Sequence, residues 1–160
     1  MDEYGNVSWK EDRATVHFER WIDAAIDAVW EAISTDDGLE KWLAPAKVNL
    51  VPNGEVNVDF GEEGLAGGAI IELVPGQVLE YNWGFPGEPD SILRIELEAH
   101  SGGGTTLRLD HSLVPADQAV GYGAGWHAHI DQLVEVVTGR DVSDWYERFS
   151  ELLPHYKGAA

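Results

Sequence analysis

Hydrophobic and polar residues alternate along most of the chain from about residue 53 to residue 112. In one run Leu79, Tyr81 and Trp83 share a face, and in another run Leu107 and Leu109 do. A period of two residues is typical of strands that have one buried face and one solvated face. The pattern therefore predicts an antiparallel sheet that is packed on one side only.

An earlier run, residues 14–22, predicts the first strand of this sheet. Its apolar residues Phe18 and Ile22 lie on the same face as Arg20. An arginine on a buried face needs a carboxylate partner, because an unpaired buried charge is costly. We therefore expect Arg20 to contact an acidic group of the protein or of a ligand.

Two short helices are predicted after this strand. Asp23 offers an N-cap for a helix over residues 26–33, and a second helix over residues 36–43 follows Thr35. Pro45 stops the second helix. These helices interrupt the sheet without forming a separate domain.

A long helix is predicted to begin at Gly125 and Trp126, because Trp126, Ile130, Leu133 and Val137 recur at helical spacing. Its apolar stripe would cover the dry face of the sheet. The sequence therefore predicts an α+β fold in which a curved antiparallel sheet of about six or seven strands wraps around one long helix.

The chain has the length of a single domain with short additions at both ends. We expect residues 1–12 to be loosely ordered, with a short edge segment through Tyr4, Val7 and Trp9 as the alternative, and residues 13–138 to form the domain. Residues 139–160 are predicted to form a helical extension that docks on the domain and ends before Pro154. The glycine-rich segments 61–68 and 84–90 are expected to be loops, which either gate a pocket or simply connect strands.

Charge and composition narrow the possible partners. The chain has 29 acidic and 10 basic residues, a net charge of -19, and no cysteine. Such a field repels phosphate backbones and anionic lipids, so we expect neither a nucleic-acid nor a membrane partner. The acidic N-terminal sequence lacks the pattern of a secretion signal, which predicts a cytoplasmic protein. The charge has two explanations, solubility in a salty cytoplasm or an acidic surface that binds a basic protein.

Several motifs together resemble a known superfamily. They are RWIDAAIDAVWEAIS, the downstream KWL, IELVPGQVLEYNW, GGGTTLRLDHS and the GW that opens the long helix. In this order they resemble the SRPBCC or START-like superfamily, which has the helix-grip fold, and within it the branch similar to the C-terminal domain of heat-shock-protein-90 ATPase activators. Ala25, which stands where that branch often has proline, and the C-terminal extension depart from it.

The resemblance implies a hydrophobic cavity between the sheet and the long helix. Strand parity and helix spacing then nominate its walls, although the same side chains would also suffice to fill a core. The predicted cavity residues are Arg20, Trp42, Leu43, Phe60, Ile71, Tyr81, Trp83, Leu93, Ile95, Leu109, His111, Trp126, Ile130 and Leu133.

Few groups in this set could perform chemistry. His111 and Tyr81 are the candidates for acid or base groups, because both are expected to point inward. No metal site and no cofactor are predicted. His127 and His129 lie about 200° apart on a helix, and His127 with Asp131 supplies only two ligands.

Three functions remain open. The first is binding of a small hydrophobic or aromatic metabolite or lipid in the cavity. The second is binding of a protein partner, as in an activator of a heat-shock-protein-90 type ATPase that acts in a stress response. The third, a cyclase or dehydratase that uses the same cavity, lacks a recognisable catalytic constellation. Both a monomer and a homodimer are compatible with the sequence.

Overall fold

The computed structural model describes residues 3–158, and within this range eight strands form one antiparallel sheet in the order β1-β2-β8-β7-β6-β5-β4-β3. The strands are β1 (Asn6–Lys10), β2 (Arg13–Ile22), β3 (Ala46–Val48), β4 (Glu55–Asp59), β5 (Leu65–Val74), β6 (Val78–Trp83), β7 (Ser91–Ala99) and β8 (Thr105–Pro115). The helices are α1 (Ile26–Ser34), α2 (Asp36–Trp42), α3 (Ala119–Val137) and α4 (Trp145–Gly158), with short 3-10 turns η1 (Gly61–Glu63) and η2 (Ala116–Gln118).

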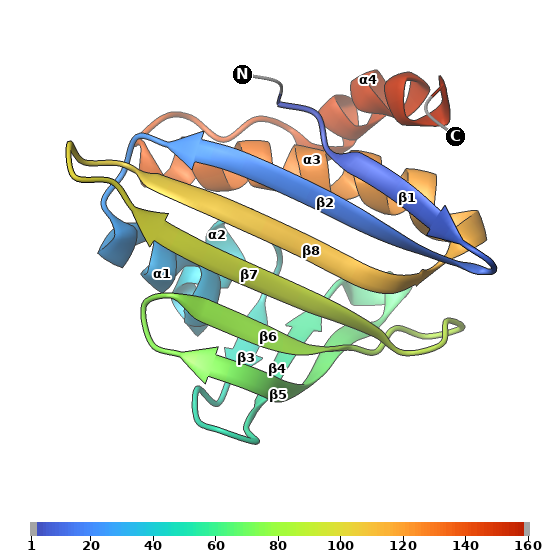
Figure 1. Cartoon of the computed structure of the whole chain (residues 1–160), viewed down its shortest axis with the longest axis horizontal. Helices are drawn as coiled ribbons and strands as arrows, with labels where there is room; N and C mark the ends of the chain where they lie inside the picture. Colours follow the sequence, from blue (N-terminus) through green and yellow to red (C-terminus); the bar gives the residue numbers. More distant parts are fainter. Residues whose placement is uncertain (1–2, 159–160) are drawn as a thin grey trace.

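Every helix lies on the same side of the curved sheet, and α3 runs behind β1, β2 and β8 (Figure 1). Phe18 of β2 pairs with Leu109 of β8, which in turn pairs with Ile95 of β7, and all three side chains are buried. Ile130 and Leu133 of α3 belong to the same core. The predicted helix-grip fold is therefore confirmed, with eight strands in place of six or seven.

The extra strand is β1, in the segment that we expected to be loosely ordered. Residues 6–10 pair with β2 along their whole length, from Asn6 opposite His17 to Lys10 opposite Arg13. Most of its side chains are exposed, so the hydrophobic pattern gave little indication of a strand. Residues 1 and 2 of the predicted segment lie outside the described residues.

The long helix begins at Ala119, six residues before the predicted start at Gly125. The intervening segment is rich in glycine, which has a low helix propensity, but tertiary packing compensates for it. A Cβ added at Gly123 would come within 2.8 Å of the Tyr156 ring, so the bare glycine lets α4 approach α3 closely. Gly125 likewise faces Trp145 of α4 rather than the sheet.

Helix α4 continues through Pro154, where the sequence predicts an end. Proline removes one backbone hydrogen bond from a helix interior. The turn after Pro154 is held instead by Tyr156, whose hydroxyl oxygen accepts a hydrogen bond from the Gly5 N–H at 2.8 Å and lies 2.9 Å from His127 Nδ1. The N-terminal segment, α3 and α4 therefore meet at one side chain.

The two short helices begin differently. Helix α2 starts as predicted, because the Thr35 hydroxyl accepts a hydrogen bond from the Gly38 N–H at 2.9 Å. Helix α1 begins after Ala25, which offers no side-chain cap, and not at the predicted cap Asp23. Of the two segments expected to be loops, residues 61–68 are partly strand, since β5 begins at Leu65. No helix within residues 3–158 is both long and apolar enough to cross a membrane.

Alanine at two glycines of α3 should have opposite effects on stability. Gly121→Ala adds a methyl group with no heavy atom within 4 Å, so we expect it to raise the free energy of unfolding by about 0.5–1 kcal/mol. Gly123→Ala pushes against the Tyr156 ring, and we expect a loss of about 1–3 kcal/mol. Urea denaturation of both variants measures these changes. Equal effects would contradict the close packing of α3 on α4.

Candidate functional site

A cleft of about 240 Å³ opens where α3 and α4 meet the end of β6 and the loops around it. Its walls are mostly aromatic side chains, together with two glycines and a few polar groups. The lining residues are Leu43, Phe60, Glu63, Trp83, Phe85, Glu88, Gln118, Gly121, Tyr122, Gly125, Trp126, His129, Trp145 and Phe149.

One wall of the cleft consists of side chains that recur at helical spacing on α3 and α4. Tyr122, Trp126 and His129 lie four and three residues apart on α3, which gives them a common face. Trp145 and Phe149, one turn apart on α4, stack on each other with ring centroids 4.8 Å apart. Because Trp145 also stacks on His129 at 5.1 Å, the two helices present a continuous aromatic surface.

The opposite wall comes from the sheet and its loops. Trp83 at the end of β6 meets Trp126 edge to face at 5.4 Å and Phe60 at 6.0 Å. Such offset and edge-to-face contacts fix ring orientations. The cleft is therefore bounded on both sides by rings that are held in place by other rings.

A chain of hydrogen bonds runs along the wall. Trp83 Nε1 donates to the Tyr122 hydroxyl at 3.2 Å, and that hydroxyl donates to Glu88 Oε1 at 2.7 Å. Burial and the neighbouring Glu88 carboxylate both raise the pKa of Tyr122 well above its usual value. Tyr122 is thus a neutral phenol that holds the Glu88 carboxylate at the edge of the cleft.

His129 is a neutral imidazole at the base of this wall. Burial lowers its pKa to about 4, despite opposing hydrogen bonds to the Trp42 backbone and to Gln132. The Trp42 carbonyl lies 3.1 Å from Nδ1 and can only accept, so the proton of the neutral ring is on Nδ1. This hydrogen bond also ties α3 to the end of α2.

The structure brings four of the predicted cavity residues to the cleft: Leu43, Phe60, Trp83 and Trp126. A larger set lies in the closed core between α3 and the sheet. These buried residues are Trp42, Tyr81, Leu93, Ile95, Leu109, His111, Ile130 and Leu133.

The predicted position of Ile71 needs correction. Its side chain is 50% exposed, whereas its neighbour Ile70 is buried. The pairing of β5 with β6 shifts register between Ile70 and Glu72, and a shift of one residue moves every following side chain to the other face. Ile71 therefore belongs to the solvated face of the sheet.

His111 is fully buried, and both of its ring nitrogens have partners. Nδ1 accepts from Trp126 Nε1 at 2.9 Å, so the proton of the neutral ring lies on Nε2 and points to Ser91 Oγ at 2.7 Å. Burial lowers the pKa of His111 to about 3. The ring connects α3 to the sheet and does not reach the cleft.

Tyr81, the other candidate for acid or base chemistry, is buried beneath the cleft, with its ring centroid 6.3 Å from that of Trp83. Burial raises its pKa well above the usual value. Its hydroxyl is therefore neutral at physiological pH. Neither His111 nor Tyr81 is among the residues that line the cleft.

Arg20 pairs with the Asp131 carboxylate of α3. Asp131 lies about half a turn around the helix from Tyr122, and so on the side away from the cleft wall. Arg20 Nη1 donates to Asp131 Oδ1 at 3.0 Å, and Arg20 Nη2 donates to the Glu3 carbonyl at 3.0 Å. Arg148 of α4 donates to the other Asp131 oxygen at 2.7 Å. The expected partner of Arg20 is thus an acidic group of the protein, at a joint between β2, α3, α4 and the N-terminal segment.

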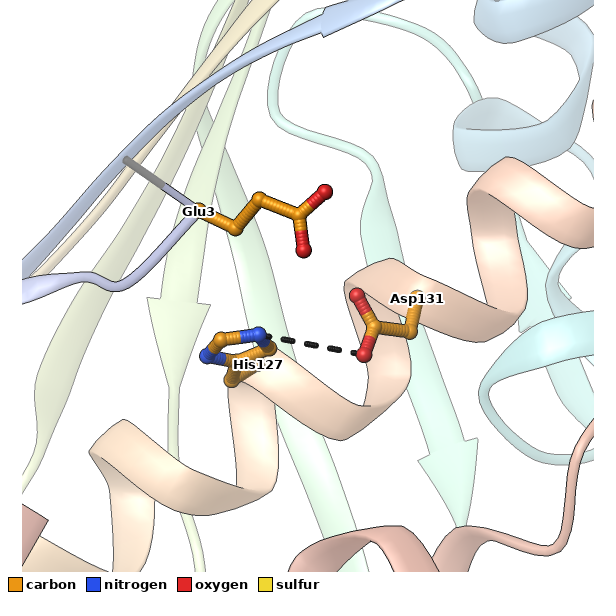
Figure 2. Close-up of side chains that lie close together, drawn as sticks. All are labelled: Glu3, His127 and Asp131. Atoms are coloured by element: carbon orange, nitrogen blue, oxygen red, sulfur yellow. Dashed lines mark ion pairs between the residues drawn. The ribbon is translucent and has the colours of Figure 1, made fainter. Parts of the chain in front are cut away.

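The same joint contains a group with the donor atoms of a metal site. Glu3, His127 and Asp131 each place one donor atom within 4.8 Å of the others, and Figure 2 shows their polar atoms facing one another. His127 is 1% exposed, and its Nε2 has no hydrogen-bond partner among residues 3–158. The third donor, Glu3, lies far from the other two in sequence, so spacing on α3 could not indicate it.

The charges around this group oppose a cation. Both Asp131 oxygens already accept hydrogen bonds from guanidinium groups, Arg20 on one side and Arg148 on the other. Two positive charges at this distance repel a metal ion by several kcal/mol in a partly buried setting. Glu3, His127 and Asp131 therefore fit an ion-pair joint better than a metal centre.

Ten of the fourteen lining residues are absent from the predicted cavity set, and they include most of the aromatic wall. Glu88 lies in a loop, Tyr122 and His129 flank Trp126 on α3, and Trp145 and Phe149 lie on α4. The spacing of Tyr122 and His129 around Trp126 was a usable signal, but the predicted helix began too late to include Tyr122. No pattern in the sequence indicates where α4 docks.

Comparison with known families gives one match over most of the chain. The model of the family described as "Activator of Hsp90 ATPase homolog 1-like protein" matches residues 23–138. A comparison with curated protein sequences finds no match.

Solved structures share the fold. The chain is similar to CalU16 from Micromonospora echinospora, with a TM-score of 0.79 and 22% identity over 99% of this chain and 96% of that one. DynU16, described as a protein in the dynemicin biosynthetic locus, gives 0.71 and 24% over 82% of this chain and 49% of its own. The Aha1 dimer from Colwellia psychrerythraea gives 0.68 and 19% over 77% and 95%.

Removing the central carboxylate of the joint should destabilise the protein. Asp131→Asn leaves the buried Arg20 guanidinium without a counter-charge, and we expect a loss of about 3 kcal/mol in the free energy of unfolding. Glu151→Gln is the control, because Glu151 pairs with Arg148 at the exposed surface and should cost less than about 1 kcal/mol. Chemical denaturation measures both. Equal losses would show that the joint is not a buried ion pair.

The neutral state of His129 makes stability depend on pH. The pKa of His129 is about 6.5 in the unfolded chain, whereas it is about 4 in the folded protein. Between these values only the unfolded state binds the proton, so stability falls as pH falls. His129→Asn should reduce the slope of unfolding free energy against pH by about 1 kcal/mol per unit near pH 5. Denaturation between pH 4.5 and 7 tests this, and identical slopes would contradict it.

Proposed function

This chain belongs to the family of activator of Hsp90 ATPase homolog 1-like proteins, and within that family we propose that it binds a small aromatic molecule in the cleft between α3, α4 and the end of β6. Family membership confirms the resemblance seen in the sequence motifs. The family model ends at residue 138, whereas the cleft takes one of its walls from α4. The binding site proposed here therefore depends on an element outside the matched region.

The observation that carries the proposal is the aromatic lining of a space that the protein leaves open. Rings from β6, α3, α4 and the adjoining loops converge on it, among them Phe60, Trp83, Trp126 and Trp145. Ligand pockets are typically concave and mostly apolar, with a few placed polar groups. Flat rings also lose little conformational entropy when they stack on a ligand.

The size of the cleft favours a compact aromatic molecule over a lipid. Its volume of about 240 Å³ is slightly below the range of about 300–1,000 Å³ that is usual for ligand pockets. A molecule of one or two fused rings fits such a space, and a long acyl chain does not. The core residues that the sequence assigned to a larger cavity pack against one another instead.

A protein partner is the second function, and the family description supports it. One related fold was solved as an Aha1 dimer, so a second copy of the chain is also a candidate partner. The net charge of -19 would favour a basic protein as the partner and would oppose the association of two copies. This function needs no cleft, which distinguishes it from the first.

An enzyme that uses the cleft is less well supported. The Tyr122 hydroxyl is engaged with Glu88, the His129 N–H is engaged with a backbone carbonyl, and His111 lies behind the wall. A catalytic acid or base must be free to exchange a proton with substrate. DynU16 is described as a protein in a biosynthetic locus, but the residues of this cleft favour holding a ligand over transforming it.

Filling the cleft should abolish ligand binding without harming the fold. A Cβ at Gly121 has open space around it, so we expect Gly121→Leu to place its side chain in the cleft and to retain or raise the free energy of unfolding. The dissociation constant for 1-naphthalenemethanol, followed by tryptophan fluorescence, should rise at least about tenfold, or about 1.4 kcal/mol.

Gly121→Ala is the matched control, because it changes the backbone propensity in the same way but leaves most of the volume open. Its affinity for 1-naphthalenemethanol should stay within about twofold of the parent protein. A stably folded Gly121→Leu variant that binds the probe as tightly as the parent would refute ligand binding in this cleft.

A further inference from the structure

The hydrogen-bond donors of the cleft wall are already used within the protein. Trp83, Trp126 and Trp145 each have an indole N–H. Trp83 donates to the Tyr122 hydroxyl, Trp126 donates to His111, and Trp145 donates to the Gly125 carbonyl at 3.2 Å. A ligand that needs an indole donor would have to break one of these bonds.

The remaining neutral donors are committed in the same way. The Tyr122 hydroxyl donates to Glu88, and the single N–H of neutral His129 points to the Trp42 carbonyl. At the start of α3 the Ala119 N–H donates to the Ala116 carbonyl, so η2 occupies part of the first turn. The exposed amide of Gln118 is then the main side-chain donor left on the described wall, and it lies at the rim.

The acceptors, in contrast, remain available and carry charge. Glu88 uses one carboxylate oxygen for Tyr122, and its second oxygen has no partner among the described residues. Glu63 lies on the same wall with no hydrogen bond or ion pair to a described residue. The lining includes two carboxylates and neither lysine nor arginine. The cleft is therefore rich in acceptors and negative in charge.

We propose that the ligand of this cleft is an aromatic organic cation, namely a flat ring that carries a protonated amine. The ring lies between the aromatic walls, and the ammonium group donates to the free carboxylate oxygen of Glu88. This inference rests on the proposed function and adds the charge and the donor pattern of the ligand.

Two physical effects favour such a cation. An ammonium group within about 6 Å of a tryptophan or tyrosine ring is attracted by the negative face of the ring quadrupole. A hydrogen bond between an ammonium group and a carboxylate is also stronger than one between neutral groups. A carboxylate on the same ring would instead be repelled by Glu63 and Glu88. It would also have no proton to donate to these acceptors.

The test compares three probes that share one ring: 1-naphthylmethylamine, 1-naphthalenemethanol and 1-naphthoate, which are a cation, a neutral donor and an anion at pH 7. We expect the amine to bind at least tenfold more tightly than the alcohol and the naphthoate to bind most weakly, as measured by tryptophan fluorescence and calorimetry at 150 mM salt. Salt at this concentration screens the long-range field of the acidic protein, whereas contacts inside the cleft are screened much less.

Two variants distinguish the effect of a charge inside the cleft from the effect of the protein's overall negative charge. Glu88→Gln keeps an acceptor for Tyr122 but removes the local charge, and we expect it to reduce the preference for amine over alcohol at least fivefold. Glu62→Gln removes the same charge from η1 at a residue that does not line the cleft. The preference of Glu62→Gln for the amine over the alcohol should stay within twofold of that of the parent protein.

The outcomes are distinguishable. If the amine and the alcohol bind equally, or if Glu62→Gln and Glu88→Gln have the same effect, the cation inference is wrong while ligand binding in the cleft stands. If the naphthoate binds most tightly, the acceptor pattern does not select the ligand and the inference is likewise overturned. If no probe binds the parent protein, both the inference and the proposed function fail.

Discussion

One buried hydrogen bond sets the orientation of the long helix on the sheet. Trp126 Nε1 donates to His111 Nδ1, and His111 Nε2 donates to Ser91 Oγ, which in turn donates to the Trp83 carbonyl at 3.1 Å. Leaving any of these buried groups without a partner costs about 1–3 kcal/mol. The bond therefore fixes which face of α3 turns toward the sheet.

The cleft follows from that orientation. Once Trp126 points to His111, the helical period places Tyr122 and His129 on the same face of α3, one turn before and one turn after it. Tyr122 then reaches Glu88, and His129 reaches the end of α2. His111 acts in this way as a positioning residue for the cleft, although its own ring is sealed from it. The choice of histidine is explained by its two nitrogens, since one must accept and the other donate.

Much of the fold could be predicted from the sequence, because strand parity depends only on local alternation. The buried faces of β2 and β8, including Arg20 and His111, lie where the alternation predicts. The register shift that exposes Ile71 could not be predicted, because it depends on how β5 bends against β6. β1 was expected only as the alternative to a loosely ordered segment, because an exposed edge strand has little hydrophobic pattern.

The cleft was harder to predict than the sheet, because its walls come from tertiary contacts. Phe60, Trp83 and Trp126 were found through parity and spacing, whereas Glu88 comes from a loop whose path no pattern reveals. The start of α3 was placed too late because glycine propensity was given more weight than packing. Tyr122 was therefore left outside the predicted helix and outside the predicted site.

Helix α4 shows how the charged joint and the cleft depend on each other. Arg148, Leu152 and Tyr156 recur every four residues and form the stripe that anchors α4, through Asp131, the core and Gly5. Trp145 and Phe149 precede and follow Arg148 on the adjacent stripe, and they close the cleft. An anchor of this kind lets the wall be aromatic and partly solvated, because the burial of Leu152 and Tyr156 stabilises the helix elsewhere. The open cleft is thus a consequence of a helix whose stability does not depend on filling it.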